Sequence, residues 1–143
     1  MSRTFCGVAL AAAVVITVAA QESKRTVWEG VYTAEQAERG RIAYAQSCAS
    51  CHGEDLRGRS TAPSLVEESF LFLWSGMSVG DLFERTWMLM PSDRPGSLPR
   101  GTYADIIAFI AQKNGFPTGS VELGVDVGAL KRIQIEEKRP PTP

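Results

Sequence analysis

The sequence contains few of the side chains that bind transition metals. Its 143 residues include one histidine, His52, and three cysteines, Cys6, Cys48 and Cys51. A structural zinc site needs four protein ligands, so these counts argue against a zinc site built by one chain. The single histidine also excludes any metal held by two histidines of the same chain.

Charge of one sign is not in excess either. Lysine and arginine number 15, and aspartate and glutamate number 16, which gives a formal net charge of −1. Both signs are dispersed along the chain, so we expect an ordinary solvated surface. Nothing in this balance indicates a nucleic-acid partner.

The sequence also lacks an apolar run of comfortable membrane-spanning length. Arg3 precedes an apolar stretch over residues 6–20, which is short for a membrane span, and its last three residues are small and offer a cleavage site before Gln21. We therefore expect residues 1–20 to be a secretory signal peptide that is removed together with Cys6, leaving no membrane span. An uncleaved N-terminal anchor is the alternative.

The most informative stretch is Cys48-Ala49-Ser50-Cys51-His52, because two cysteines three residues apart and an adjoining histidine form the attachment signature of a c-type haem. In a helical turn, residues three apart lie on the same side, so both sulfurs can form thioethers with vinyl groups on one edge of a porphyrin. The histidine then lies below the iron as an axial ligand. A thioredoxin-like thiol pair would need a βαβ context that the flanking sequence does not offer, and a chance match on a surface turn is the remaining alternative.

Capping residues and apolar periodicity predict four helices. The first begins at Thr33, where Thr33 and Gln36 form a capping box, and it runs towards Cys48. Gly40 in its interior costs stability relative to alanine, so we expect another helix to approach closely there; a tolerated weak spot is the alternative. The other three helices are expected over Glu67–Trp74, from Ser78 to the residues before Pro91, and from Thr102 to Asn114.

These helices place an all-α domain at residues 33–117. Residues 21–32 are expected to be a lead-in that folds back on the domain through Trp28. Residues 118–143 are expected to be an extended C-terminal tail, and the charged, proline-rich end of it, residues 136–143, to be disordered. A domain of this size buries only a modest core, so the sequence favours a small fold of three to five short helices wrapped around one covalently bound haem.

Two further residues are candidates for the environment of the iron. Pro63 follows a glycine-rich loop, and its carbonyl can accept the second imidazole N–H of His52, which would fix the tautomer; an ordinary turn proline is the alternative. Met90 lies where a helix gives way to a proline-rich loop, and a rigid backbone can hold the weak thioether donor against iron. Met88 and Met77 match core filling at helical spacing, so Met90 is the predicted sixth ligand and Met88 the alternative.

In this order of features the chain resembles a class I mono-haem c-type cytochrome of the small bacterial periplasmic kind. The resemblance covers about residues 28–117. It implies that His52 is the fifth ligand of the iron and Met90 the sixth, and that the Pro63 carbonyl orients the histidine.

The resemblance also has implications outside the axial ligands. It implies that the N- and C-terminal helices cross with a glycine against an aromatic ring, which matches Gly40 with Phe109 or Tyr103. It further implies an aromatic or basic side chain on the haem propionates, for which Trp74 and Arg94 are candidates by their positions.

The function that follows from the resemblance is one-electron transfer by haem c in the periplasm, without enzymatic activity. Such a carrier shuttles electrons between a dehydrogenase and an oxidase or other acceptor, because an iron with His/Met ligands keeps them in both oxidation states. One alternative is a dedicated haem subunit of a larger dehydrogenase complex, with residues 118–143 lying on the partner. The other is a haem enzyme or gas sensor with an open sixth position, which is disfavoured because the one histidine is already used.

Overall fold

The computed structural model describes residues 25–139. The predicted signal peptide at 1–20, with Cys6, lies outside the described residues, as do the first part of the lead-in at 21–24 and residues 140–143. Within 25–139, no helix is long and apolar enough to cross a membrane.

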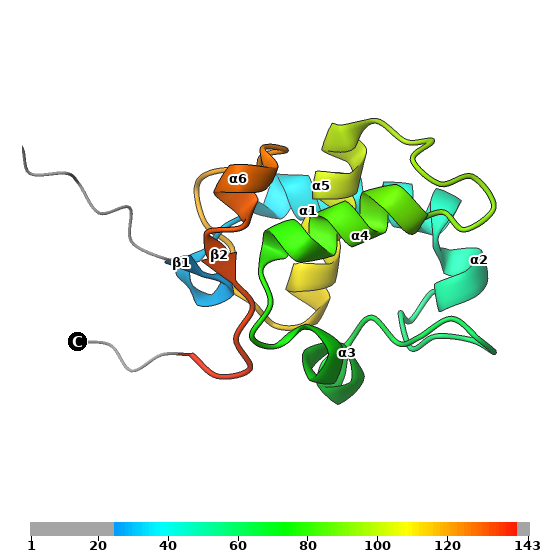
Figure 1. Ribbon diagram of the computed structural model, residues 1–143, viewed down its shortest axis with the longest axis horizontal. Coiled ribbons are helices and arrows are strands. Elements are labelled where there is room, and N and C mark those ends of the chain that lie inside the picture. Colours follow the sequence, from blue (N-terminus) through cyan, green and yellow to red (C-terminus); the bar gives the residue numbers. More distant parts are fainter. Residues whose placement is uncertain (1–24, 140–143) are drawn as a thin grey trace, which may run out of the picture.

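The described part of the chain is almost entirely helical (Figure 1). Its elements in order are β1 (Arg25–Thr26), the 3₁₀ turn η1 (Val27–Glu29), α1 (Ala34–Ser47), α2 (Ala49–His52), α3 (Glu67–Trp74), α4 (Val79–Leu89), α5 (Arg100–Lys113), α6 (Val127–Leu130) and β2 (Ile133–Gln134). The all-α prediction is confirmed. The described residues form six α-helices instead of three to five, because α2 and α6 are single turns of four residues that periodicity does not reveal.

The boundaries of the longer helices follow their capping residues. Helix α3 has the predicted bounds, and α4 begins at a capping box of Ser78 and Asp81 and ends before Met90. Helix α5, however, begins at Arg100 rather than at Thr102. The reason is that the Pro99 carbonyl already accepts the backbone N–H of Thr102 at 2.9 Å, so the first turn forms without a side-chain cap.

Helices α1 and α5 cross in direct backbone contact at Gly40. A Cβ atom at this buried position would overlap the carbonyl group of Asp105 on α5, so the predicted close approach is confirmed. The partner is backbone rather than an aromatic ring; the aromatic contact is made one turn later, where the rings of Tyr44 and Phe109 lie 5.4 Å apart. At the rim, Arg39 forms a bidentate pair with the Asp105 carboxylate at 3.0 and 3.1 Å.

The capping box predicted at the start of α1 forms only in part. The Thr33 hydroxyl accepts the Gln36 backbone N–H at 3.1 Å, but the Gln36 side chain does not return to Thr33. Instead it makes two hydrogen bonds to the backbone of Leu123, of 2.9 and 2.7 Å. Gln36 is buried, and a buried amide needs both its donor and its acceptor satisfied, which the C-terminal segment achieves.

The C-terminal segment folds back on the domain and is not an extended tail over the described residues. Strand β2 pairs in parallel with β1, so that both ends of the described chain lie side by side (Figure 1). Its apolar side chains enter the same core as the helices, and the buried ones are Leu123, Leu130, Ile133 and Ile135. At the start of the stretch expected to be disordered, the Glu136 carbonyl accepts the indole N–H of Trp28 at 2.9 Å. Trp28 thus folds back as predicted.

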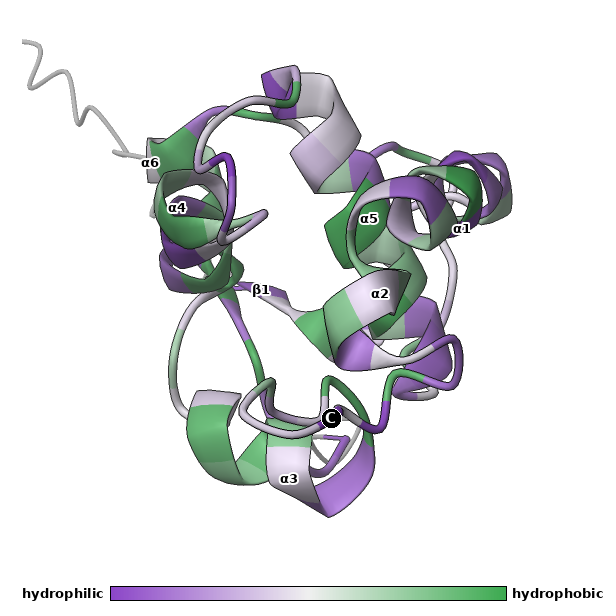
Figure 2. Ribbon diagram, turned by 90° about the vertical axis from the view of Figure 1, so that its right-hand side faces the viewer, coloured by the Kyte–Doolittle hydropathy of each residue, from purple (hydrophilic) through white to green (hydrophobic). Residues whose placement is uncertain are grey.

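In the view of Figure 2, helices α2, α3, α4 and α5 surround a common centre. Hydrophobic residues of α5 face that centre. This arrangement puts the turn that carries Cys48, Cys51 and His52 on one side of the molecule and the C-terminal end of α4, next to Met90, on another.

We predict that Gly40→Ala destabilises the protein, because the new methyl group meets backbone of α5 that cannot move aside. A loss of about 1–3 kcal/mol in the free energy of unfolding is expected, measured by thermal or denaturant unfolding of the holoprotein. Gly101→Ala on α5 is the matched control, since a Cβ there meets nothing within 4 Å and alanine favours helix by up to about 1 kcal/mol. Equal stabilities of the two variants would contradict this account of the crossing.

Candidate functional site

The predicted attachment signature forms a tight helical turn directly after α1. Cys48 caps α1 and precedes α2, and its carbonyl accepts the backbone N–H groups of Cys51 at 3.1 Å and His52 at 3.0 Å. Cys48 is half-buried and Cys51 is exposed, and both are free thiols. The spacing therefore adopts the turn that the sequence predicts.

The imidazole of His52 is buried and held by one hydrogen bond. It is 7% exposed, and its Nδ1 lies 2.9 Å from the carbonyl oxygen of Pro63, which is the contact predicted for that proline. Because a carbonyl oxygen can only accept, Nδ1 is the donor in this contact, which leaves Nε2 as the ring nitrogen available to a metal. Within residues 25–139, every fully buried side-chain nitrogen or oxygen has a hydrogen-bond partner. Because Nε2 of His52 has none there, this atom is not fully buried and is accessible.

A folded loop brings Pro63 back to the histidine. The His52 carbonyl accepts the Gly58 N–H at 2.8 Å, and farther along the Leu56 carbonyl accepts the Leu65 N–H at 2.8 Å. The Leu56 side chain anchors the loop in the core with 1% exposure. Pro63 is thus placed by backbone hydrogen bonds on both sides of it, and not by its own ring alone.

Tyr44 is a site-supporting residue that the sequence did not single out for this role. Its hydroxyl donates to the Gly53 carbonyl at 2.7 Å, directly after His52. Burial raises the pKa of the Tyr44 phenol above its ordinary value, and the nearby Cys48 and Asp55 add to the shift. The signal that could have revealed this contact is the position of a tyrosine on the buried face of α1, since a buried hydroxyl needs a partner.

The thiol chemistry of Cys48 does not suit a redox pair. Burial, followed by the neighbouring Cys51, raises the pKa of the Cys48 thiol to about 11. Thiol–disulfide enzymes instead lower this pKa to generate thiolate. The described residues contain no group of three or more His, Cys, Asp and Glu side chains arranged to hold a metal ion.

Hydrogen bonds on both sides hold the backbone of Met90. Its N–H donates to the Thr86 carbonyl at 2.9 Å, and its carbonyl accepts the Tyr103 hydroxyl at 2.7 Å and the Gly96 N–H at 3.3 Å. Met90 is half-buried and is followed by a buried proline. By contrast, Met88 is 62% exposed and Met77 is 41% exposed.

The two propionate candidates lie in different environments. Trp74 is half-buried at the end of α3, with its ring 6.5 Å from that of Phe70. Arg94 is exposed, and its Nε donates to the adjacent carboxylate of Asp93 at 3.3 Å. Among residues 25–139, neither side chain forms a hydrogen bond to His52 or Met90, so the structure does not bring all the predicted site residues into one bonded cluster.

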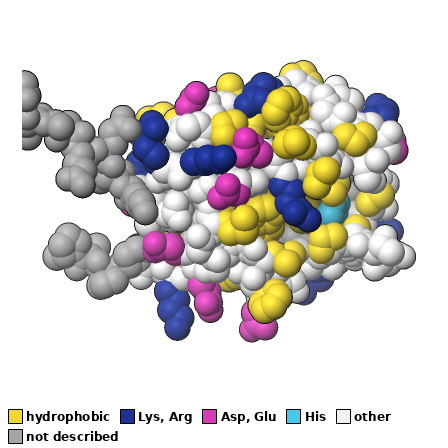
Figure 3. All heavy atoms as spheres, viewed as in Figure 1, with side chains coloured by type: hydrophobic (Ala, Val, Ile, Leu, Met, Phe, Trp, Pro, Cys, Tyr) yellow, Lys and Arg dark blue, Asp and Glu magenta, His cyan; other side chains and the backbone are white. Residues whose placement is uncertain are grey.

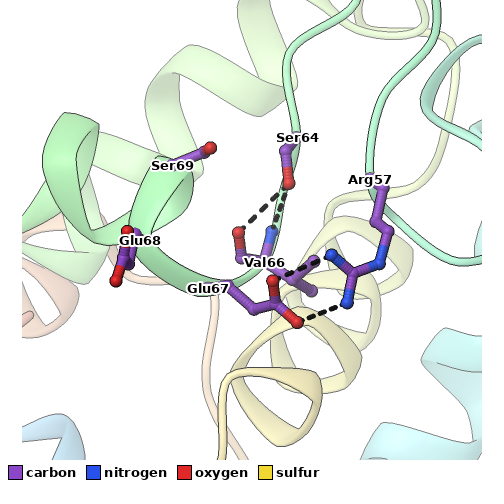
Figure 4. A pocket seen from close by; sticks show the side chains of 6 residues that line it. All are labelled: Arg57, Ser64, Val66, Glu67, Glu68 and Ser69. Atoms are coloured by element: carbon purple, nitrogen blue, oxygen red, sulfur yellow. Dashed lines mark hydrogen bonds and ion pairs between the residues drawn. The ribbon is translucent and has the colours of Figure 1, made fainter.

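A pocket of about 450 Å³ opens at the start of α3 (Figure 4). Arg57 and Glu67 face each other across it through hydrogen bonds of 2.9 and 2.5 Å, and Glu68 points away from this pair. The charges of the pair neutralise each other on the surface, and none of the predicted site residues lines the pocket. It is therefore not the candidate site.

The surroundings of His52 fit a large, flat, apolar cofactor. Several apolar side chains of α3, α4 and the loops before α3 and α5 are only partly buried against the core, namely Leu65, Leu71, Trp74, Trp87 and Leu98. Figure 3 shows the histidine among hydrophobic side chains on one face of the molecule. An accessible Nε2 lone pair, two cysteines on the same turn and this apolar lining are the donor set and the surface that a covalent haem requires.

A comparison with known protein families agrees with this chemistry. Residues 35–110, more than half of the chain, match the family model for cytochrome C oxidase, cbb3-type, subunit III. No curated protein matches the sequence. Among solved structures, the chain is similar to the sulfane dehydrogenase SoxCD from Paracoccus pantotrophus, with 20% sequence identity and a TM-score of 0.47. The similarity covers 66% of this chain and 55% of that one, so the chain spans just over half of its length.

The family match covers α1, the Cys48 to His52 turn, α3, α4 and most of α5, which are the elements that build the site described above. The chain belongs to the cytochrome C oxidase, cbb3-type, subunit III family and is a c-type cytochrome whose cofactor is covalently bound haem c.

Proposed function

We propose that this cytochrome is an exported, periplasmic one-electron carrier and not an enzyme. In this proposal Cys48 and Cys51 form the two thioethers, His52 is the fifth ligand of the iron and Met90 is the sixth. The observation that carries the proposal is the hydrogen bond from His52 Nδ1 to the Pro63 carbonyl, because it orients the imidazole and leaves the other ring nitrogen for the iron.

The haem supplies exchange of one electron between the ferric and ferrous states. The contribution of this chain is to hold both ligands in place. The Pro63 carbonyl fixes the plane of the His52 ring and increases the basicity of its free nitrogen. Three backbone hydrogen bonds fix Met90. Ligands that do not move between oxidation states keep the structural rearrangement small, which favours rapid electron transfer.

The choice of Met90 over Met88 rests on rigidity. A thioether is a weak, uncharged donor, so it binds iron well only where the backbone cannot move away from the metal. Met88 lies on the exposed side of α4, whereas Met90 is tied to α4, to α5 and to the following loop.

Trp74 is a better candidate than Arg94 for the side chain that contacts the haem propionates. The indole N–H of Trp74 makes no hydrogen bond within residues 25–139 and is a donor that a carboxylate could accept. The charge of Arg94 is already balanced by Asp93. We therefore keep Trp74 as the candidate and regard Arg94 as the weaker one.

The alternative of a dedicated haem subunit loses its original motivation. The alternative places residues 118–143 on a partner, whereas apolar side chains in the described part of this segment pack into the core of its own domain. A freely diffusing carrier between a dehydrogenase and an oxidase or other acceptor is the function that we favour. Its interface with each partner would be small and short-lived.

The first prediction concerns attachment of the haem. The exported protein should have the mass of the chain after cleavage behind Ala20 plus one haem. Cys48→Ser and Cys51→Ser should each leave at most one thioether, and the double variant should lose covalent haem entirely. Intact mass spectrometry measures all of these, and full retention of covalent haem by the double variant would refute the assignment.

The second prediction concerns the sixth ligand. Met90→Ala should abolish the weak absorption band at the red edge of the ferric spectrum, convert the iron to high spin and lower the reduction potential, because the neutral thioether favours the ferrous state. Met88→Ala is the matched control and should resemble the wild type. Loss of the band in Met88→Ala instead would show that the ligand is Met88.

The third prediction separates a carrier from an enzyme, a sensor or a fixed subunit. The wild-type ferrous protein should bind CO slowly, elute as a single chain after native extraction, and be reoxidised by membranes that contain a terminal oxidase. Rapid binding of CO would favour an open sixth position. Stable co-purification with a dehydrogenase, together with no reoxidation as a free protein, would favour a dedicated subunit.

A further inference from the structure

Arg100, the first residue of α5, links three parts of the chain. Its guanidinium carbon lies 4.4 Å from the centre of the Trp87 ring and 4.9 Å from that of Phe83, both on α4. Its Nη2 donates to the Val125 carbonyl in the C-terminal segment at 3.0 Å. No carboxylate within residues 25–139 forms an ion pair with it, so two aromatic faces and one carbonyl hold this cation.

This cluster lies next to the contact that fixes Met90. Trp87 is three residues before Met90, and Arg100 is three residues before Tyr103, which donates to the Met90 carbonyl at 2.7 Å. Arg100 and Tyr103 lie three apart on α5 and share a face, whereas Met90 is the extended residue that caps the end of α4. The Arg100–Trp87 contact therefore joins α5 to the last turn of α4, and the Tyr103–Met90 hydrogen bond joins α5 to the cap of that turn.

The loop after Met90 also passes close to Trp87. A Cβ atom at Gly96 would lie 3.8 Å from the Trp87 indole nitrogen, and the Gly96 N–H donates to the Met90 carbonyl at 3.3 Å. Displacement of the Trp87 ring would consequently disturb both the end of α4 and the loop that holds Met90.

We propose that Arg100 is a positioning residue for the sixth ligand. It holds Trp87, and through Trp87 the last turn of α4, against α5 and the C-terminal segment, and so slows the departure of the Met90 sulfur from the iron. This inference rests on the proposed function, in which Met90 is that ligand. Lysine is a poor substitute, because the extended guanidinium lies over two rings and donates to the Val125 carbonyl at the same time, whereas a compact ammonium makes fewer of these contacts at once.

The test measures how fast an external ligand displaces the sixth ligand. Cyanide is added to the ferric holoprotein at neutral pH, and the rate of loss of the red-edge band is recorded at cyanide concentrations where the displacement step limits the rate. The variants are Arg100→Gln and Arg100→Lys. Arg85→Gln is the charge-matched control, because Arg85 is exposed on α4 and makes no hydrogen bond or ion pair within residues 25–139.

A second control separates positioning from general stability. Tyr32→Phe removes a buried hydrogen bond of 2.6 Å to the Phe116 carbonyl, away from the Met90 loop, and should lower the unfolding temperature without freeing the ligand. Met90→Ala provides the reference for a protein without this ligand.

We expect Arg100→Gln to bind cyanide about fivefold faster or more, because the cation–π contacts with Trp87 and Phe83 are lost. Arg100→Lys should lie between it and the wild type, while Arg85→Gln and Tyr32→Phe stay within about twofold of the wild type. An unchanged rate in Arg100→Gln, or the same increase in Tyr32→Phe, would overturn the role of Arg100 while leaving Met90 as the ligand. A red-edge band that survives in Met90→Ala would overturn the ligand assignment, and with it the role of Arg100.

Discussion

The close contact of α1 with α5 at Gly40 is the constraint on which the rest of the site depends. The two backbones touch there without an intervening side chain, so the relative position of the helices is fixed within narrow limits. The C-terminal end of α1 leads directly into Cys48 and His52, and α5 carries Tyr103, whose hydroxyl holds the Met90 carbonyl. One helix crossing therefore sets the positions of both proposed axial ligands.

The same kind of hydrogen bond, from a side chain to a backbone carbonyl, occurs at three places in the site. Tyr44 donates to the Gly53 carbonyl, His52 to the Pro63 carbonyl and Tyr103 to the Met90 carbonyl. In each case a side chain on a helix satisfies a carbonyl of irregular backbone, which would otherwise be costly to bury. The irregular segments that follow His52 and Met90 are thus held in part by side chains of the helices.

The segments outside the family match complete the domain. Residues 25–32 and 118–139 pair through β1 and β2, and the buried amide of Gln36 joins α1 to Leu123. Lys131 pairs with Glu84 of α4 at 2.8 Å, and Val125 accepts from Arg100. The C-terminal segment therefore contacts α4 and α5, the two helices on either side of the Met90 loop. It stabilises these helices although it contributes no proposed ligand.

The sequence by itself determined the helices and the chemistry of the attachment turn. Capping residues, apolar periodicity and proline placed α3 and the end of α4, and the spacing of Cys48, Cys51 and His52 has only one geometry in a helical turn; the contact of Pro63 with His52 was also predicted. Capping residues, apolar periodicity and the cysteine–histidine spacing are local signals, because each is contained within one short segment of the chain. The start of α5, the second partner of Gln36, the folded C-terminal segment and the place of Arg100 between Trp87 and Val125 were decided only by the tertiary structure. Each depends on which distant backbone atom or ring approaches, and a pattern in one segment carries no information about that partner.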